Sequence, residues 1–339
     1  MKQGKAPVGR SPLRNLTGVQ IVGTGCFLPD KVITNEDLAS LGCDADWILQ
    51  RTGIRERRHA PPEMATGDMA VAAAKRCFLA SDVDPQDVDL LLLATLSPDR
   101  LMPATATTIQ DQLGLNCAAM DLSAACAGFV YALCTAMQFV ATRCSRRALV
   151  IGSDAMSRVI DPGDKTTYPL FGDGAGAVLL APGSSDQGAL AYTLGSDGSG
   201  VDLLYRDIGG AIEPFQPNIK NDRSWYLEME GRPVFKWAVR VVDDSSRQVV
   251  EAAQLTLDQI DCWLFHQANV RILDAAANSL GIDRDRVVMH LDRYGNTSAA
   301  SIPIALDETI RAGGIARGDH LLMSGFGAGL AWGSTVWRW

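Results

Sequence analysis

Runs of hydrophobic residues with the spacing of strands alternate with runs that have the spacing of helices along the whole chain. Residues 88–96 (VDLLLLATL) form a continuous apolar run and residues 147–154 (RALVIGSD) a similar one, as expected for strands covered on both faces. Residues 67–80 and 128–144 carry the helix-like pattern. This alternation predicts an α/β fold with parallel strands.

The pattern of the first half of the chain returns in the second half. Segment 84–95 (DPQDVDLLLLAT) resembles 256–267 (TLDQIDCWLFHQ), because both lead from an acidic turn into a buried strand. Two further pairs follow in the same order, and each pair is separated by roughly 155–175 residues. We interpret this as an internal duplication, with chance similarity as the alternative. The further pairs are 147–154 with 319–327 and 171–180 with 326–335.

Each half then contains a helix that ends in Leu-Gly, a strand, and the start of a helix of small residues. In the first half the start of this helix contains Cys126 between alanines, and in the second half it contains Asn296 in the sequence YGNTSAA. His266 closes the predicted strand 261–267. Because strand ends in such folds converge outside the carboxyl edge of the sheet, we expect these three side chains to meet.

Together the three residues have the chemistry of an acyl-transfer site. A cysteine at a helix N-terminus has a lowered pKa and forms thioesters, and a nearby imidazole favours its thiolate. Asn296 donates hydrogen bonds to an oxygen on which charge develops. Taken singly, Cys126 fits a buried packing residue, His266 a structural histidine and Asn296 a turn or cap.

Two glycine-rich stretches lead into strands, whereas a dinucleotide fingerprint would open a helix. We interpret residues 172–176 as tight turns. Residues 325–329 are expected to lie beside the cysteine and to aim backbone N–H groups at an oxyanion.

Composition narrows the functional classes. The 339 residues carry a net charge of −8 without a basic stripe, which argues against nucleic acid as the main partner. No apolar run reaches the length of a membrane span, and residues 1–16 lack the core of a signal peptide, so we expect a flexible arm there. The eight cysteines form no CxxC pair and the four histidines no ligand motif. We therefore expect a cytoplasmic protein with reduced thiols, no metal site and no membrane contact.

Four motifs in collinear order resemble β-ketoacyl-acyl carrier protein synthase III, a family of the thiolase-like condensing enzymes. They are SAACAGF around Cys126, HQANVRI from His266, GNTSAASIPIALDE around Asn296 and GFGAGLAWG at 325–333. The resemblance covers about residues 18–339. It implies a five-layered αβαβα thiolase fold built from two duplicated halves, 17–184 and 185–339, and a homodimer.

The resemblance also implies a reaction. Cys126 would take an acyl group from acyl-coenzyme A (acyl-CoA) and condense it with malonyl-acyl carrier protein in a decarboxylative Claisen reaction that initiates fatty acid synthesis, with no cofactor. His266 and Asn296 would hydrogen-bond the malonyl thioester oxygen, and the N–H groups of Cys126 and Ala328 would form an oxyanion hole. The remaining implied residues are Trp47, Arg51, Lys165 and Asn269 for coenzyme A, Met102, Phe171 and Phe326 for the acyl pocket, and Arg271 for carrier-protein docking.

Some positions differ from the family pattern. Met102 stands where many members present phenylalanine from the partner subunit, which would admit a longer or branched acyl group or simply fill the gap. Asn278 and Ser279 replace lysines thought to face the carrier protein, which weakens the case for docking there. Lys165 stands in place of arginine, and Ala328 in place of glycine.

Two alternatives stay open. One is a relative in specialised metabolism that condenses or transfers acyl groups onto another acceptor. The other is an inactive scaffold of the same fold, although retention of all three polar residues argues against it. A true thiolase is disfavoured because the last cysteine is Cys262, so no second cysteine lies near the C-terminal glycine loop.

Overall fold

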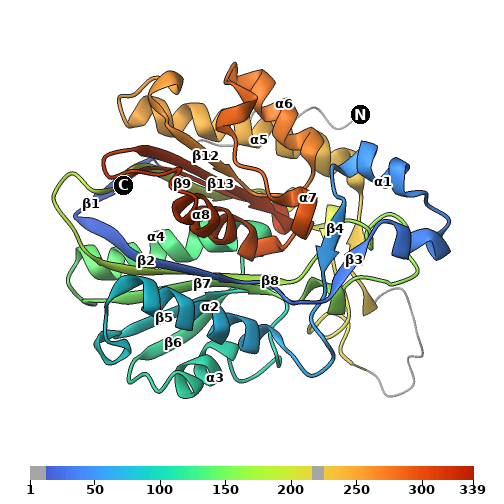
Figure 1. Ribbon diagram of the computed structural model, residues 1–339, viewed down its shortest axis with the longest axis horizontal. Coiled ribbons are helices and arrows are strands. Elements are labelled where there is room, and N and C mark those ends of the chain that lie inside the picture. Colours follow the sequence, from blue (N-terminus) through green and yellow to red (C-terminus); the bar gives the residue numbers. More distant parts are fainter. Residues whose placement is uncertain (1–12, 216–224) are drawn as a thin grey trace.

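The computed structural model describes residues 13–215 and 225–339, which form five stacked layers (Figure 1). Two five-stranded sheets enclose a central layer of helices α4 and α8, while α2 with α3 and α5 with α6 cover the outer faces. The predicted αβαβα thiolase fold is thus confirmed. The helices are α1 (Ala45–Thr52), α2 (Thr66–Ser81), α3 (Thr105–Gln112), α4 (Gly128–Ala141), α5 (Gly231–Ala252), α6 (Val270–Leu280), α7 (Leu291–Tyr294) and α8 (Ser301–Arg311).

The two sheets have the same strand plan. The first has the order β2-β8-β7-β5-β6 and the second β1-β9-β14-β13-β12. The strands are β1 (Arg14–Thr17), β2 (Val19–Phe27), β5 (Leu90–Ala94), β6 (Ala118–Leu122), β7 (Ala148–Asp154), β8 (Gly174–Pro182), β9 (Gly188–Ser196), β12 (Cys262–Phe265), β13 (His320–Gly327) and β14 (Ala331–Arg338), with short pairs β3 (Val32–Thr34) with β4 (Glu56–Arg58) and β10 (Leu204–Tyr205) with β11 (Glu228–Met229).

The duplication is visible in the pairing directions. Strands β8 and β14 run antiparallel to both of their neighbours, and β7 with β5 matches β13 with β12 as a parallel pair. The expectation of parallel sheets was therefore too simple. Each sheet is mixed, because β7 joins β8 and β13 joins β14 without the helix that a parallel crossover needs.

At the sheet edges one expectation is wrong, and a second is wrong for residues 14–16. The strand expected before Asn296 forms only as a single bridge between Val287 and Trp263, which takes the place of β6 in the second half. Of the flexible arm expected at 1–16, residues 1–12 lie outside the described residues. Residues 14–16 belong to β1, which pairs with β9, so the first described strand lies in the second sheet.

The central layer explains where the small residues lie. Helix α4 is buried along almost its whole length because it faces both sheets. Gly174 and Gly176 lie within β8, so the tight turns expected at 172–176 are wrong for them. A Cβ on Gly176 would lie 2.7 Å from Cβ of Pro303, so this glycine lets α8 approach the first sheet closely.

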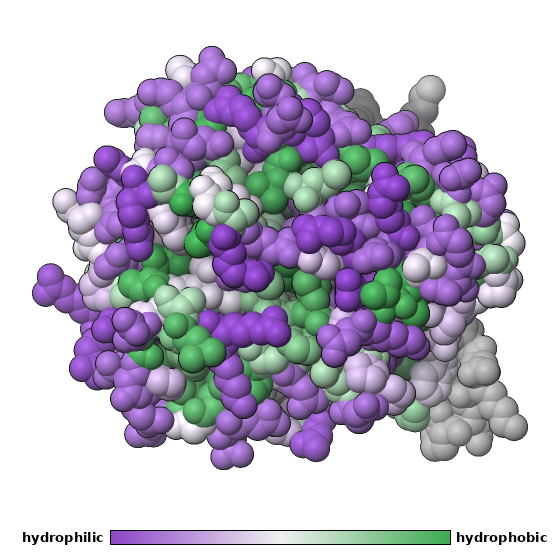
Figure 2. Space-filling view, viewed as in Figure 1, coloured by the Kyte–Doolittle hydropathy of each residue, from purple (hydrophilic) through white to green (hydrophobic). Residues whose placement is uncertain are grey.

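Polar side chains cover most of the face seen in Figure 2, and the apolar ones there form small separate groups. Among the helices described, none has the length and apolar character needed to cross a bilayer.

Candidate active site

Cys126 lies at a sharp turn between β6 and α4. A short 3₁₀ turn, Ala125–Ala127, separates the strand from the helix, and Ala125 has a left-handed φ of 47°. This conformation is strained for a residue with a Cβ. It places the cysteine at the carboxyl edge of the first sheet, with its Sγ 3.4 Å from the hydroxyl of Ser298.

The thiol is the form that this environment favours. Burial raises the pKa of Cys126 to about 12, against a smaller lowering by the Ser298 hydrogen bond. The expectation of a lowered pKa therefore does not hold for the free site, because desolvation outweighs the effect of the helix N-terminus. Acylation then requires a route by which the thiol proton leaves.

His266 follows β12 directly. Its backbone N–H donates to the Ser324 carbonyl at 2.8 Å, and its Nδ1 lies 2.7 Å from the Ser301 hydroxyl. Burial, followed by the neighbouring His290, lowers the pKa of His266 to about 3. The imidazole is therefore neutral at physiological pH and acts through hydrogen bonds, and it supplies no positive charge to the cysteine.

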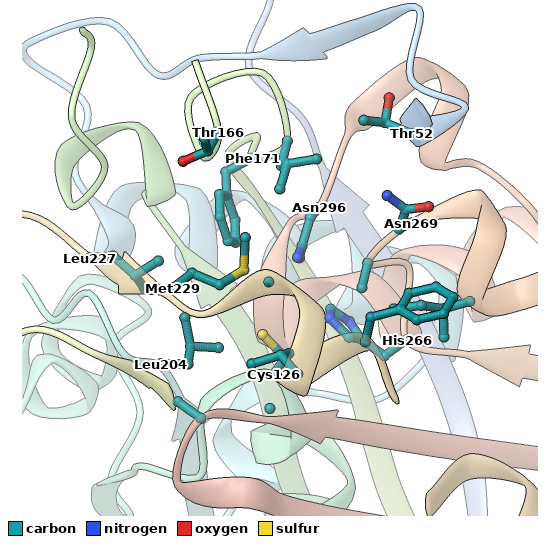
Figure 3. A pocket seen from close by; sticks show the side chains of 18 of the residues that line it. Thr52, Cys126, Thr166, Phe171, Leu204, Leu227, Met229, His266, Asn269 and Asn296 are labelled. Carbon is teal, nitrogen blue, oxygen red and sulfur yellow. The ribbon is translucent and has the colours of Figure 1, made fainter. Parts of the chain in front are cut away.

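Asn296 is fixed through its backbone. Its N–H donates to the Leu170 carbonyl at 2.8 Å, and its own carbonyl accepts from the Gly172 N–H at 3.0 Å. The side-chain Oδ1 accepts from the Ser298 N–H at 2.9 Å. Because the amide oxygen is engaged, the Nδ2 donors are left to face the cavity, and Figure 3 shows the nitrogen directed there.

The three predicted residues meet in one cavity of about 590 Å³, as the duplication implied (Figure 3). They come from the ends of two sheets and from the segment before α8, so the cavity floor lies where the two halves join. Eight of the other predicted residues also line this cavity: Trp47, Arg51, Lys165, Phe171, Asn269, Arg271, Phe326 and Ala328.

The wall formed by α1 and α6 carries three of the four predicted coenzyme A residues, and Lys165 lies in the loop between β7 and β8. The Arg51 guanidinium lies over the Trp47 ring, 4.9 Å from its centroid. Asn269 caps the N-terminus of α6, and its Nδ2 donates to the Arg51 carbonyl at 3.2 Å. Arg271 donates to the Gln50 carbonyl at 3.2 Å, so the two helices are tied together at the cavity wall.

Met102 is the exception among the predicted residues. Its side chain is 82% exposed and is absent from the lining of the cavity that a single chain forms.

The glycine-rich segment 325–329 lies beside the cysteine, as expected. A Cβ on Gly325 would lie 3.0 Å from Cα of Ala127, and one on Gly327 would lie 2.7 Å from the backbone nitrogen of Cys126. Gly329 has a φ of 70° and turns the chain into β14. Two glycines thus allow β13 to approach the nucleophile turn closely.

Several neighbouring residues had not been identified from the sequence. Ser298 contacts Cys126, and Ser301 contacts His266. Asp154 in turn accepts a hydrogen bond from Ser298. The sequence did contain a signal for these three polar residues, since Asp154 ends a predicted strand and both serines lie in the GNTSAAS segment around Asn296. The apolar wall was not predicted, and it includes Met156, Leu204, Leu227, Met229 and Phe235.

Within residues 13–215 and 225–339, no group of three or more metal-ligating side chains is positioned to hold an ion.

Comparison with known proteins is consistent with this geometry. The sequence matches the family model of 3-oxoacyl-[acyl-carrier-protein] synthase III over residues 120–198, and the model of its C-terminal part over residues 250–339. It is 50% identical to the β-ketoacyl-[acyl-carrier-protein] synthase III of Rhodopirellula baltica, over 96% of this chain and 99% of the relative. "3-Oxoacyl" and "β-ketoacyl" denote the same group.

Two solved structures agree over nearly the whole fold. The synthase III of Aquifex aeolicus has a TM-score of 0.87 and 40% identity, over 95% of this chain and 100% of that chain. The synthase III of Thermus thermophilus has a TM-score of 0.89 and 40% identity, over 94% of this chain and 98% of that chain.

Proposed function

The chain belongs to the β-ketoacyl-acyl carrier protein synthase III family of condensing enzymes, and we propose that it joins an acyl group from acyl-CoA to malonyl-acyl carrier protein. Full-length similarity to synthases of this name favours the initiation of fatty acid synthesis over a role in specialised metabolism. The observation that carries the proposal is the single cavity into which Cys126, His266 and Asn296 open together.

In the first step Cys126 attacks the thioester carbon of acyl-CoA. The carbonyl oxygen becomes an oxyanion, which the backbone N–H groups of Cys126 and Ala328 stabilise. Both residues line the cavity, and Gly327 between them carries no side chain that would cover the Cys126 nitrogen. Donors already in place are effective because they cost no reorganisation when charge develops.

In the second step the malonyl thioester loses CO₂ and becomes an enolate. The neutral His266 and the Asn296 amide donate hydrogen bonds to the enolate oxygen. Ser301 supports this role of the histidine, because a serine hydroxyl that donates to Nδ1 leaves the proton on Nε2. The carbanion carbon then attacks the acyl-cysteine and releases the β-ketoacyl product.

The α1–α6 wall is the proposed binding surface for coenzyme A. The Trp47 indole, 40% exposed with Arg51 over its face, offers a stacking surface for adenine. Arg51 and Lys165 supply positive charge for phosphates, and Asn269 supplies an amide to the pantetheine arm. Arg271, exposed at the cavity mouth, is the proposed contact for the acidic carrier protein.

The acyl chain is proposed to lie between Phe171 and Phe326, both almost fully buried in the cavity wall. Met102 would complete this pocket from a second copy of the chain, which is why we propose a homodimer. The edge strand β6 and the exposed side chains of Leu101 and Met102 offer a surface for that copy. A solution mass of twice 36.3 kDa is expected.

No cofactor takes part in the proposed steps, which use side chains, backbone N–H groups and the two substrates. All eight cysteines are free thiols, which supports the proposal that the enzyme works in the reducing cytoplasm.

The test is the intact mass of the protein after incubation with a panel of acyl-CoA thioesters, followed by peptide mapping. We expect one acyl adduct, on Cys126, and the acyl group that reacts fastest identifies the primer. Cys144 is the exposed cysteine, so a Cys144→Ser variant controls for adventitious transfer. An adduct that persists in Cys126→Ala, or no adduct from any thioester, would contradict the proposal.

A further inference from the structure

Ser298 occupies the position in the second half that Ala125 occupies in the first. Each begins a 3₁₀ turn at the entrance to a central helix, and each has a left-handed φ, 52° at Ser298 and 47° at Ala125. The two turns pack against each other. The duplication therefore places a strained serine directly opposite the nucleophile turn.

Asp154 holds this second turn. The carboxylate is fully buried at the end of β7, and its Oδ2 accepts from the Ala299 N–H at 3.2 Å. Its Oδ1 accepts from the Thr95 hydroxyl and from the Leu96 and Ser97 N–H groups at 2.8–3.1 Å. The Ser298 hydroxyl is a further donor to the same carboxylate.

The Ser298 oxygen thus lies between two ionisable groups. Its hydroxyl donates to Asp154, and a serine oxygen that donates one hydrogen bond still has lone pairs for another. The Cys126 sulfur is 3.4 Å away, within the range of a hydrogen bond to sulfur. His266 is an unsuitable acceptor for the thiol proton, because a Ser301 hydroxyl that donates to its Nδ1 leaves Nε2 protonated and therefore a donor.

We infer that Ser298 and Asp154 form a proton relay for Cys126, with Ser298 as a catalytic residue and Asp154 as the group that positions it and stores the proton. The inference rests on the proposed function of Cys126 as acyl acceptor. It divides the site into two parts, in which His266 with Asn296 serves decarboxylation and Ser298 with Asp154 serves acylation.

The protons balance over the step. As the Cys126 sulfur bonds to the acyl carbon, its S–H bond breaks and the proton moves to the Ser298 oxygen, while the Ser298 proton moves to the Asp154 carboxylate. When the tetrahedral adduct collapses, the bond from the acyl carbon to the coenzyme A sulfur breaks. The leaving sulfur takes a proton from Ser298, and Asp154 returns its proton to Ser298.

The electrostatics of the pair fit this exchange. Burial raises the pKa of the Asp154 carboxyl and of the Cys126 thiol, so a proton moves between two groups of which neither is strongly stabilised as an anion. The Ser298 hydrogen bond lowers the pKa of Cys126, whereas the charge of Asp154 raises it.

The test compares two reactions in Ser298→Ala and Asp154→Asn. We expect the single-turnover rate of Cys126 acylation to fall about a hundredfold in each at pH 7 and to recover as pH rises, since hydroxide then removes the thiol proton. Decarboxylation of malonyl-acyl carrier protein should change less than threefold. Thr297→Val removes a neighbouring hydroxyl that has no partner among the described residues, and it should leave both rates unchanged.

Asp154→Asn separates a relay from simple charge repulsion. If Asp154 acts on Cys126 only through its negative charge, removal of that charge lowers the thiol pKa and acylation becomes faster. Faster acylation would therefore overturn the inference, as would equal losses in both reactions of Ser298→Ala. If Asp154→Asn does not fold, Ser298→Ala decides alone.

Alkylation of Cys126 by iodoacetamide, followed across pH, keeps this test independent of the acyl donor. Ser298 contacts the sulfur, Asp154 acts on it through its charge, and His266 lines the same cavity. The alkylation profile of Ser298→Ala should move to higher pH, and an unmoved profile would contradict the relay. Failure of wild-type protein to accept any acyl group, with this shift present, would count against the proposed function alone.

Discussion

Gly327 lies so close to Cys126 that a Cβ at position 327 would be 2.7 Å from the cysteine backbone nitrogen. Its counterpart in the first half is Asp154, since each residue ends the strand next to the other half's turn. Asp154 accepts a hydrogen bond from the Ala299 N–H, the equivalent of the Cys126 N–H. One half thus covers this donor with a carboxylate, and the other leaves it open to a substrate oxygen.

Gly327→Ala should therefore slow acylation of Cys126 about a hundredfold, the usual effect of losing one oxyanion donor. The φ of Gly327 is −175°, which any residue adopts, so the effect is steric and carries no backbone strain. The measurement is the single-turnover rate of acyl-enzyme formation by intact mass. Gly198→Ala, where a Cβ meets open space, is the matched control. Unchanged acylation in Gly327→Ala would remove the Cys126 N–H from the mechanism.

The sequence was sufficient for the parts of the fold that depend on repeated hydrophobic patterns. The apolar runs at β5 and β7 and the small-residue helix α4 were predicted close to their observed bounds. The duplication alone was enough to place Cys126, His266 and Asn296 at one edge. Such predictions succeed because burial on both faces leaves a continuous apolar signal.

The remaining features depend on tertiary contacts that leave no periodic pattern. Burial sets the pKa of Cys126, and local sequence indicated only the helix N-terminus. Gly176 resembles a turn residue, yet its role is to admit α8. Ser298 and Asp154 are far apart in the chain and meet only where the two halves join. Met102 is exposed and does not line the cavity, which its sequence context did not indicate.

Asn296→Asp should abolish most malonyl decarboxylation while leaving acylation of Cys126 nearly intact. The aspartate keeps an oxygen for the Ser298 N–H, which Asn296 binds at 2.9 Å, but it replaces the amide donor by an acceptor. A loss of at least about a hundredfold is expected, because the developing enolate then faces a carboxylate instead of a donor. Release of CO₂ from malonyl-acyl carrier protein is the measurement, and Asn15→Asp at an exposed position of β1 is the control. Equal losses of both reactions would indicate structural damage instead.

Trp47→Ala should raise the KM for acyl-CoA roughly tenfold with little change in kcat. The indole lies at the cavity wall under Arg51, and its proposed contact is with the adenine, which does not react. This contact is therefore the same in the ground state and the transition state. Trp47→Phe, which keeps a stacking surface, should recover much of the affinity. Steady-state kinetics with acyl-CoA as the varied substrate measures both constants. A fall in kcat at unchanged KM would show that Trp47 does not act by binding coenzyme A.

Acid should destabilise the protein in part through His266. Burial lowers its pKa from 6.5 to about 3, so between these values the unfolded chain binds a proton that the folded chain does not. Stability is therefore fully present above about pH 6.5 and is lost as pH falls towards 3, and the change from pH 7 to pH 5 amounts to about 2 kcal/mol for this group. Burial lowers the pKa of His59 and His290 in the same direction, so their contributions add. Guanidinium unfolding at both pH values should show a smaller pH effect in His266→Gln than in the wild type. Equal pH effects in the two proteins would mean that the folded site takes up a proton on His266 as readily as the unfolded chain does, and that burial does not hold the imidazole neutral.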